Sequence, residues 1–165
     1  MELTEIDKGA LLEAIVKELA GACERMTARA KAAAESAVHE EARSEDSHDT
    51  RAIEESYLAR GQAARAAEME GDLATMKSLR ARSFADSEPI AATALVELED
   101  DGGASRTLLI VPRCGGRNLH FGGREITLAT PASPLGAALM GASEGDEVEI
   151  SIKGRKRTYE ILGTA

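Results

Sequence analysis

The sequence predicts an α+β protein in two parts: an antiparallel coiled-coil helical hairpin over residues 1–82 and, after a linker at 83–89, a domain over residues 90–165 with a small antiparallel sheet and one short helix. Three observations predict this division. Apolar residues recur every three or four positions through two long stretches of the first half, as they do in coiled coils. A Pro-containing segment then interrupts the helical pattern. Beyond it, short runs of strand-forming residues alternate with Gly-containing turns.

The first helix is expected from Gly9 to about Ala42. Its apolar stripe would consist of Leu12, Val16, Leu19, Cys23, Met26, Ala30, Ala33 and Ala37. These side chains become smaller toward the far end, so the partner helix can approach closely there. At ~1.5 Å per residue the helix would be ~45 Å or more long. In so small a protein we expect a helix of this length to project from the body.

The second helix is expected from Thr50 or Ala52 to about Arg82. Its stripe would consist of Ala59, Gln62, Ala66, Met69, Leu73 and Met76. The polar segment 43–50 then forms the tip of the hairpin, and Asp49 or Thr50 would cap the second helix. The region around this tip is acidic and contains Glu40, Glu41, Glu45, Asp46, Asp49, Glu54 and Glu55. The tip is therefore the candidate functional feature of the first half.

The second half reads as about five strands and one helix. The strands are expected at 93–98, 106–111, 125–130, 146–152 and 158–162. Ser133 would cap a short helix that has Pro134 at its first position and ends at Gly141. The Gly-Gly pairs at 102–103, 115–116 and 122–123 lack the Lys and Ser/Thr that follow the glycines of a phosphate-binding loop, so we expect turns there.

Composition argues against several classes of function. With 29 acidic and 20 basic residues the chain carries a net charge of −9, which repels nucleic-acid phosphates, and we expect no sequence-specific DNA binding. Four aromatic residues, Tyr57, Phe84, Phe121 and Tyr159, are too few for a base-stacking or aromatic-lined pocket. No apolar run of ~18 residues indicates a membrane span. We therefore expect a soluble, cytoplasmic monomer whose acidic end would suit a basic groove of a protein partner.

The cysteines and histidines do not form a metal site by their spacing. Cys23 lies in the helical stripe, where it would be a small core residue, and Cys114 lies in a Gly-rich loop as a free thiol. His39 and His48 flank the tip, but they are nine residues apart and no third ligand follows at metal-binding spacing. We do not expect a stable zinc site.

Three sequence segments carry a resemblance to a known family. The run Ser133-Pro-Leu-Gly-Ala-Ala-Leu-Met-Gly141, with Glu144-Gly-Asp-Glu-Val-Glu-Ile150 and Tyr159-Glu-Ile-Leu162 after it, resembles the C-terminal domain of bacterial Gre transcript-cleavage factors. The hairpin with its acidic tip is similar to the coiled coil of the same family. Tyr57-Leu-Ala-Arg60 is similar to a Tyr-containing stretch just after the tip in Gre proteins. The order of parts matches over nearly the whole chain.

This resemblance implies a fold and a role. The C-terminal domain would be FKBP-like and would dock on bacterial RNA polymerase, with Ser133, Pro134, Leu135 and Gly136 as the docking candidates. The coiled coil would enter the polymerase secondary channel. Its tip carboxylates, Asp46 and Asp49 with Glu45 and Glu54 as substitutes, would share a transient Mg²⁺ with the polymerase active site. No cofactor would be bound stably, and the protein would be an accessory factor rather than an enzyme, because the polymerase itself would cleave the RNA.

The tip departs from the pattern of cleavage-competent Gre proteins, which carry an Asp-x-x-Glu motif with its Glu four residues before the Tyr. Counting back from Tyr57 places Ile53 at the Glu position and Thr50 at the Asp position, and neither side chain binds a metal. Asp46 and Asp49 keep the three-residue spacing but lie four residues further from the Tyr. The segment 103–124 also diverges. Both stimulation and inhibition of cleavage stay open, and the displaced carboxylates favour a modulating or inhibitory role.

Two other classes of function are alternatives to this role. Prolyl isomerase activity would need an aromatic-lined cavity, for which the chain has too few aromatic residues. A coiled-coil adaptor or FKBP-like interaction module that does not act on polymerase is the remaining alternative. The basic run of Lys153, Arg155, Lys156 and Arg157 is either a solvated turn or a docking contact.

Overall fold

The computed structural model describes residues 2–43, 50–85 and 87–165. The chain divides into two compact units, each described here by itself. The hairpin unit is Val16–Lys77, and the sheet unit combines Met1–Ile15 with Ser78–Ala165. The division expected from local pattern, at 1–82, 83–89 and 90–165, stays a prediction. The contacts group the first fifteen residues with the C-terminal sheet.

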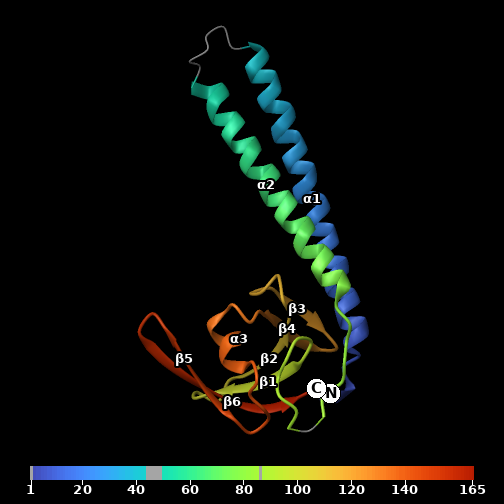
Figure 1. Cartoon of the computed structure of the whole chain (residues 1–165), viewed down its shortest axis with the longest axis vertical. Helices are drawn as coiled ribbons and strands as arrows, with labels where there is room; N and C mark the ends of the chain where they lie inside the picture. Colours follow the sequence, from blue (N-terminus) through green and yellow to red (C-terminus); the bar gives the residue numbers. More distant parts are fainter. Residues whose placement is uncertain (1, 44–49, 86) are drawn as a thin grey trace. The chain divides into compact units, whose positions relative to one another are not determined.

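The hairpin unit consists of two long antiparallel helices, α1 (Lys8–Arg43) and α2 (Thr50–Ser78), which lie side by side in Figure 1. Two pairs of side chains link the helices near their far ends. The Ser36 hydroxyl donates to Glu55 Oε2 at 3.0 Å. Arg51 Nε lies 3.8 Å from Glu40 Oε2. A step of four residues forward along α1 thus matches a step of four residues backward along α2, which confirms the predicted hairpin.

The predicted seam is buried or half-buried throughout. On α1, Leu19 and Cys23 are nearly inaccessible, and Ala37 is the last buried seam residue before the tip. On α2, Ala66 and Met76 are buried, and Ala52 adds a buried position that the predicted stripe did not include. The alanines at the far end bury little apolar area. The two helices must therefore pack closely there to make van der Waals contact.

Both helices begin close to the predicted residues, but α2 ends early. Asp7 accepts a hydrogen bond from the N–H of Ala10 at 3.0 Å and so caps α1. The second helix was expected to reach Arg82 and ends at Ser78. No Gly or Pro lies between these residues. Arg82 lies beyond the end of α2 and contacts Phe84, Glu88 and Lys8.

The sheet unit contains six strands in the order β3-β4-β2-β1-β6-β5. Their bounds are β1 Leu95–Asp100, β2 Ser105–Ile110, β3 Asn118–Phe121, β4 Arg124–Ala129, β5 Glu147–Ile152 and β6 Arg155–Thr164. A short helix, α3 (Pro134–Leu139), follows β4, and a 3-10 turn (Leu3–Glu5) precedes α1. The predicted α+β class is confirmed, and five of the strands overlap the predicted ones.

The sheet differs from the prediction in two linked respects. The strand β3 was not expected, and β2 and β4 pair in parallel, so the sheet is mixed rather than wholly antiparallel. After β2 the chain crosses to the sheet edge and returns through the Gly122-Gly123 turn, where both residues have positive φ. This return inserts β4 between β3 and β2 and makes it run in the same direction as β2. The Gly-Gly turn was predicted, but the strand before it has only four residues.

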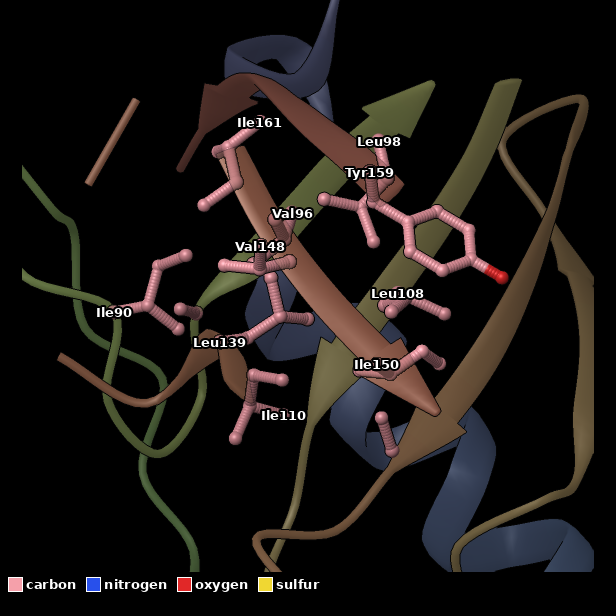
Figure 2. Close-up of a cluster of buried hydrophobic side chains, with 12 residues drawn as sticks. Ile90, Val96, Leu98, Leu108, Ile110, Leu139, Val148, Ile150, Tyr159 and Ile161 are labelled. Atoms are coloured by element: carbon pink, nitrogen blue, oxygen red, sulfur yellow. The ribbon is translucent and has the colours of Figure 1, made fainter. Parts of the chain in front are cut away.

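The main core lies on one face of the sheet (Figure 2). Its members come from five strands, from α3 and from the segment before β1: Ile90, Ala94, Val96, Leu98, Leu108, Ile110, Ala129, Leu139, Val148, Ile150, Tyr159 and Ile161. Most are β-branched or Leu, and burial of each such side chain contributes about 2 kcal/mol. Tyr159 is the one fully enclosed aromatic residue in this cluster. A core of this kind does not need the aromatic residues that the chain lacks.

The opposite face of the sheet is also partly buried. Leu95, Leu109 and Leu128 alternate with the core residues along their strands and are almost inaccessible. Leu3 and Ile6 are buried in the same unit, and the 3-10 turn packs against β1. The N-terminal segment therefore helps to cover this second face, which explains why the contacts group it with the sheet.

Candidate functional site

The short helix α3 carries the four predicted docking residues, and its N-terminus is fixed by a cap. The Ser133 hydroxyl accepts a hydrogen bond from the Gly136 N–H at 3.1 Å and donates to the Thr130 carbonyl at 2.8 Å. Pro134 occupies the first helical position, and Gly141 follows the helix with a φ of +81°. The predicted helix with a Ser cap, an initial Pro and a terminal Gly is therefore confirmed.

Gly136 is required by a close approach between chain segments. A Cβ at this position would lie 2.0 Å from the Thr130 carbonyl oxygen, where no side chain fits. Of the four docking candidates, Gly136 and Ser133 thus have roles inside the unit, and Leu135 packs partly against the core. Pro134 is exposed. The Ser-Pro-Leu-Gly motif shapes this surface, and Pro134 is the member most available to a partner.

The end of the hairpin unit carries the second candidate site. Asp46, Asp49 and Glu45 lie outside the described residues, so their proposed role stays a prediction. Glu54 is described and is exposed on the first turns of α2. Within residues 2–43, 50–85 and 87–165, no group of three metal-ligating side chains could hold a metal ion.

The carboxylates beside the tip differ in their availability. Glu40 and Glu55 both lie near Arg51, whose Nε is 3.8 Å and 3.7 Å from their carboxylate oxygens. Glu55 also accepts the Ser36 hydrogen bond. These two acids stabilise the hairpin end, although exposed pairs of this kind contribute only about 0–1 kcal/mol each. Glu41 and Glu54 are exposed and have no ion pair among the described residues.

Large apolar side chains are exposed close to the same end. Tyr57 is 68% exposed, Val38 65%, Leu58 60% and Ile53 47%. Only three other large apolar residues in the described chain are comparably exposed, and all three belong to the sheet unit. Ile53 and Tyr57 are four residues apart on α2 and therefore share a helix face. The two positions at which the family pattern has carboxylates, Thr50 and Ile53, are both exposed.

A cation–aromatic cluster in the sheet unit was not anticipated from the sequence. The Arg82 guanidinium lies 3.9 Å from the Phe84 ring centroid, and the Lys8 ammonium lies 4.8 Å from it. Arg82 Nη1 also pairs with Glu88 Oε1 at 2.7 Å. Lys8 Nζ donates to the carbonyl of Arg82 and, at 3.4 Å, to that of Thr93. These contacts hold the segment that follows α2 against the start of α1.

The electrostatics of this cluster follow from its burial. Desolvation lowers the pKa of Lys8 to about 8, the nearby Arg82 adds to this decrease, and Glu88 partly opposes it. The backbone N–H of Ala85 and the Arg82 guanidinium hold the pKa of Glu88 below its usual range. No sequence signal indicated the cluster, because Lys8 is more than seventy residues from Arg82, Phe84 and Glu88 and meets them only in the folded unit.

Among the helices of the described chain, none combines the length and the apolar composition that crossing a membrane would require.

The chain thus combines a hairpin of two long helices with a mixed sheet that carries a capped Ser-Pro-Leu-Gly helix. The family model described as transcription elongation factor, GreA/GreB, C-terminal domain matches residues 88–164. The match includes all six strands and α3, and it confirms the resemblance to the Gre family seen in the sequence motifs. The sheet-bearing domain of this chain is thus similar to the C-terminal domain of transcription elongation factors.

Solved structures with low sequence identity are similar to a longer part of the chain. A structure of the transcription factor Gfh1 has 24% identity, covers 90% of this chain and 92% of its own, and has a TM-score of 0.39. Gfh1 of Thermus thermophilus has 21% identity, with 91% and 94% coverage and a TM-score of 0.37. A GreA/GreB factor from Nitrosomonas europaea has 19% identity, with 72% and 94% coverage and a TM-score of 0.36. No curated protein sequence matches significantly. The family match of residues 88–164 is therefore the finding that defines the class.

Proposed function

We propose that this protein binds bacterial RNA polymerase and regulates transcription elongation by inserting the acidic end of its helical hairpin into the polymerase secondary channel. The single observation that carries this proposal is the match of residues 88–164 to the GreA/GreB C-terminal domain. The hairpin supports it independently. At ~1.5 Å per residue, the 36 residues of α1 span about 54 Å, and two packed helices are narrow enough to enter a channel that excludes a globular domain.

The chemistry at the tip would be electrostatic. Mg²⁺ prefers carboxylate oxygens and retains several waters, so one or two carboxylates brought to the polymerase active centre can change the binding of a metal there. A second metal ion stabilises the attacking and leaving oxygens in phosphodiester cleavage. Asp46 and Asp49 are the proposed carboxylates, with Glu45 and the exposed Glu54 as substitutes. The protein would be an accessory factor, and the polymerase would perform any cleavage.

The proposed effect is modulation of the active centre, either stimulation or inhibition of transcript cleavage. Thr50 and Ile53 occupy the positions where the pattern of cleavage-competent members has carboxylates. Exposed side chains there would contact the channel but could not supply a metal ligand. This arrangement favours an inhibitory or modulating role over a simple cleavage factor.

An assay of backtracked-complex cleavage tests the proposal. Purified core RNA polymerase is halted, backtracked and incubated with and without the protein, and the rates of RNA cleavage and elongation are measured. We expect the protein to change one or both rates and the double variant Asp46→Ala/Asp49→Ala to lose this effect. The matched control is Glu68→Ala/Glu70→Ala, which removes two charges from exposed positions along the shaft of α2.

Two outcomes would contradict the proposal. One is an unchanged effect in the Asp46→Ala/Asp49→Ala variant, which would exclude the tip carboxylates. The other is failure of the protein to co-purify with core polymerase, which would favour the adaptor or FKBP-like interaction module. No observation favours prolyl isomerase activity, because Tyr159 is enclosed in the core and lines no open cavity.

A further inference from the structure

The outer end of the β5–β6 hairpin is a dense cluster of positive charge on an otherwise acidic protein. Lys153, Arg155, Lys156 and Arg157 fall within five residues and are all exposed, whereas the whole chain has a net charge of −9. The tight turn at Lys153-Gly154, where both residues have positive φ, holds them at the hairpin end. Neither the fold nor the proposed tip chemistry requires these cations.

The strand register divides these cations between the two faces of the hairpin. Ile152 pairs with Arg155 and Ile150 pairs with Arg157. Directly paired residues lie on the same face of a sheet, and so do residues two apart along a strand. Ile150 is a core residue, so Ile152, Arg155 and Arg157 continue the core side of the hairpin beyond the core. Lys156 lies on the other face and pairs with Glu149 at 2.9 Å.

We call the side of the hairpin that bears Ile152, Arg155 and Arg157 the basic face. Its side chains are available to bind a partner. Ile152 is 45% exposed, and neither arginine forms an ion pair within the described part of the chain. Arg157 is close enough to Asp100 to attract it. The Asp100 carboxylate, however, already accepts the N–H groups of Gly102 and Ala104, each at 3.0 Å. The basic face thus combines an exposed apolar side chain with two guanidinium groups that form no ion pair within the described part of the chain.

We propose that the basic face binds an acidic, partly apolar segment on the surface of the partner protein. Guanidinium groups bind carboxylates through paired hydrogen bonds, and arginine is enriched in protein interfaces. Ile152, which lies opposite Arg155 next to the turn, would contact an apolar side chain of that segment. Under the proposed function the partner is RNA polymerase, so the inference rests on that function and adds a second, electrostatic contact.

The surroundings of the cluster favour a protein partner over a nucleic acid. The opposite face of the same hairpin carries exposed carboxylates at Glu147, Glu149 and Glu160, which would repel a phosphate backbone. No described aromatic side chain on the hairpin is exposed for base stacking, because Tyr159 is buried. A protein segment with a few carboxylates and one apolar side chain can bind the basic face without approaching the carboxylates on the opposite face.

The position of α3 makes the basic face continuous with the surface around α3, so the acidic segment of the partner could lie along both. α3 packs against β5, and its Leu139 joins the same core cluster as Ile150 (Figures 1 and 2). The basic face is therefore the outward continuation of the side that α3 covers. A segment lying on it could reach the exposed Pro134 and Met140 of the α3 region.

Binding to purified core RNA polymerase, measured with full-length labelled variants at two salt concentrations, tests the inference. Arg155→Glu and Lys156→Glu are a matched pair, because the two residues are adjacent, both are exposed and both substitutions change the charge by the same amount. We expect Arg155→Glu to weaken binding about tenfold, as loss of an interface arginine can. Lys156→Glu should weaken binding by less than about twofold, like a charge outside the interface. Ile152→Ser should also weaken it, with less salt dependence.

Each of the other outcomes would overturn either this inference or the proposed function. Equal losses in Arg155→Glu and Lys156→Glu, or no loss in either, with wild-type binding intact, would overturn the inference and leave the proposed function standing. A failure of the wild-type protein to bind polymerase would overturn the proposed function and, with it, this contact. Binding of the wild type to a single-stranded RNA or a DNA duplex that Arg155→Glu abolishes would assign the basic face to nucleic acid and overturn the inference. Thermal unfolding of each variant checks that it is folded.

Discussion

Gly136 lies against the backbone of Thr130 so closely that a Cβ on it would be 2.0 Å from the Thr130 carbonyl oxygen and 2.7 Å from its carbonyl carbon. Because the clash is with backbone, rotation of a flexible side chain cannot relieve it. The Ser133 hydroxyl is bonded to both residues, donating to the Thr130 carbonyl and accepting from the Gly136 N–H. The Ser-Pro-Leu-Gly motif is thus a tightly built turn into α3 as well as a candidate docking surface.

Replacement of Gly136 by Ala should destabilise the sheet unit by about 1–3 kcal/mol, as overpacking does in other close-packed sites. The shift of the urea unfolding midpoint of the full chain measures this loss. Ala137→Ser is the matched control, because Ala137 is exposed on the same helix and should tolerate the change. Equal stability of Gly136→Ala and wild type would show that the turn can move away from Thr130.

Ser133→Ala should cost about 1 kcal/mol, since it removes the side-chain acceptor of the Gly136 N–H at the start of α3. Ser133→Thr retains a hydroxyl and should recover most of that stability. Thermal unfolding of the three proteins at one pH measures the difference. A Ser133→Thr variant as unstable as Ser133→Ala would mean that the hydroxyl is not the stabilising group.

Ala37→Leu tests the close approach of the helices near the hairpin end. Ala37 is buried in the seam, so the larger side chain should destabilise the hairpin by about 1–3 kcal/mol or force the helices apart. Loss of helical circular dichroism on heating is the measurement. Ala34→Leu, at an exposed position on the same helix, is the control and should be nearly neutral. Similar melting of the two variants would contradict tight packing at Ala37.

The lowered pKa of Lys8 predicts how stability depends on pH. The pKa of this ammonium is about 8 in the folded protein and near 10.5 when exposed, so between these values the unfolded chain binds the proton that the folded chain has lost. Stability contributed by this site should therefore rise as pH increases from about 8 to 10.5. Below pH 8 the buried charge opposes folding by a constant amount.

Lys8→Met, which keeps the length of the side chain and removes the charge, provides the comparison. The difference in unfolding free energy between wild type and Lys8→Met should shift in favour of wild type as pH rises through that window. The effect should be small, because the ammonium is only half-buried. A pH-independent difference between the two proteins would contradict the lowered pKa.

Carboxylates installed at the tip should change the effect on RNA cleavage. Thr50 and Ile53 are exposed at the start of α2, so Thr50→Asp/Ile53→Glu should fold normally and place two acids at the spacing of the cleavage-competent pattern. We expect faster cleavage in backtracked complexes with this variant than with wild type. Thr50→Asn/Ile53→Gln is the uncharged control. No difference between the charged and uncharged variants would argue against metal chemistry at these positions.

The elements that could be predicted are those whose signals are local. The three-four stripe determined both helices of the hairpin, and the Ser-Pro…Gly signal determined α3 with its cap. The Gly-Gly pairs located three turns, in which Gly103, Gly116, Gly122 and Gly123 have positive φ. Family-like motifs in the last third of the chain then indicated the class that the match of residues 88–164 bears out.

Only the tertiary structure decided four features of the fold. These are the early end of α2, the strand β3, the parallel pairing of β2 with β4 and the Lys8–Arg82–Phe84 cluster. The pairing of β2 with β4 and the contacts of Lys8 join residues far apart in sequence. Arg82 lies beyond the end of α2, where its guanidinium contacts Phe84 and Glu88. The sequence by itself determined the two long helices, the short capped helix and five of the six strands, because local spacing and backbone preference control them. Only the fold decided which residues of the Ser-Pro-Leu-Gly motif are exposed and how the basic residues divide between the two sides of the β5–β6 hairpin, because both depend on register and packing.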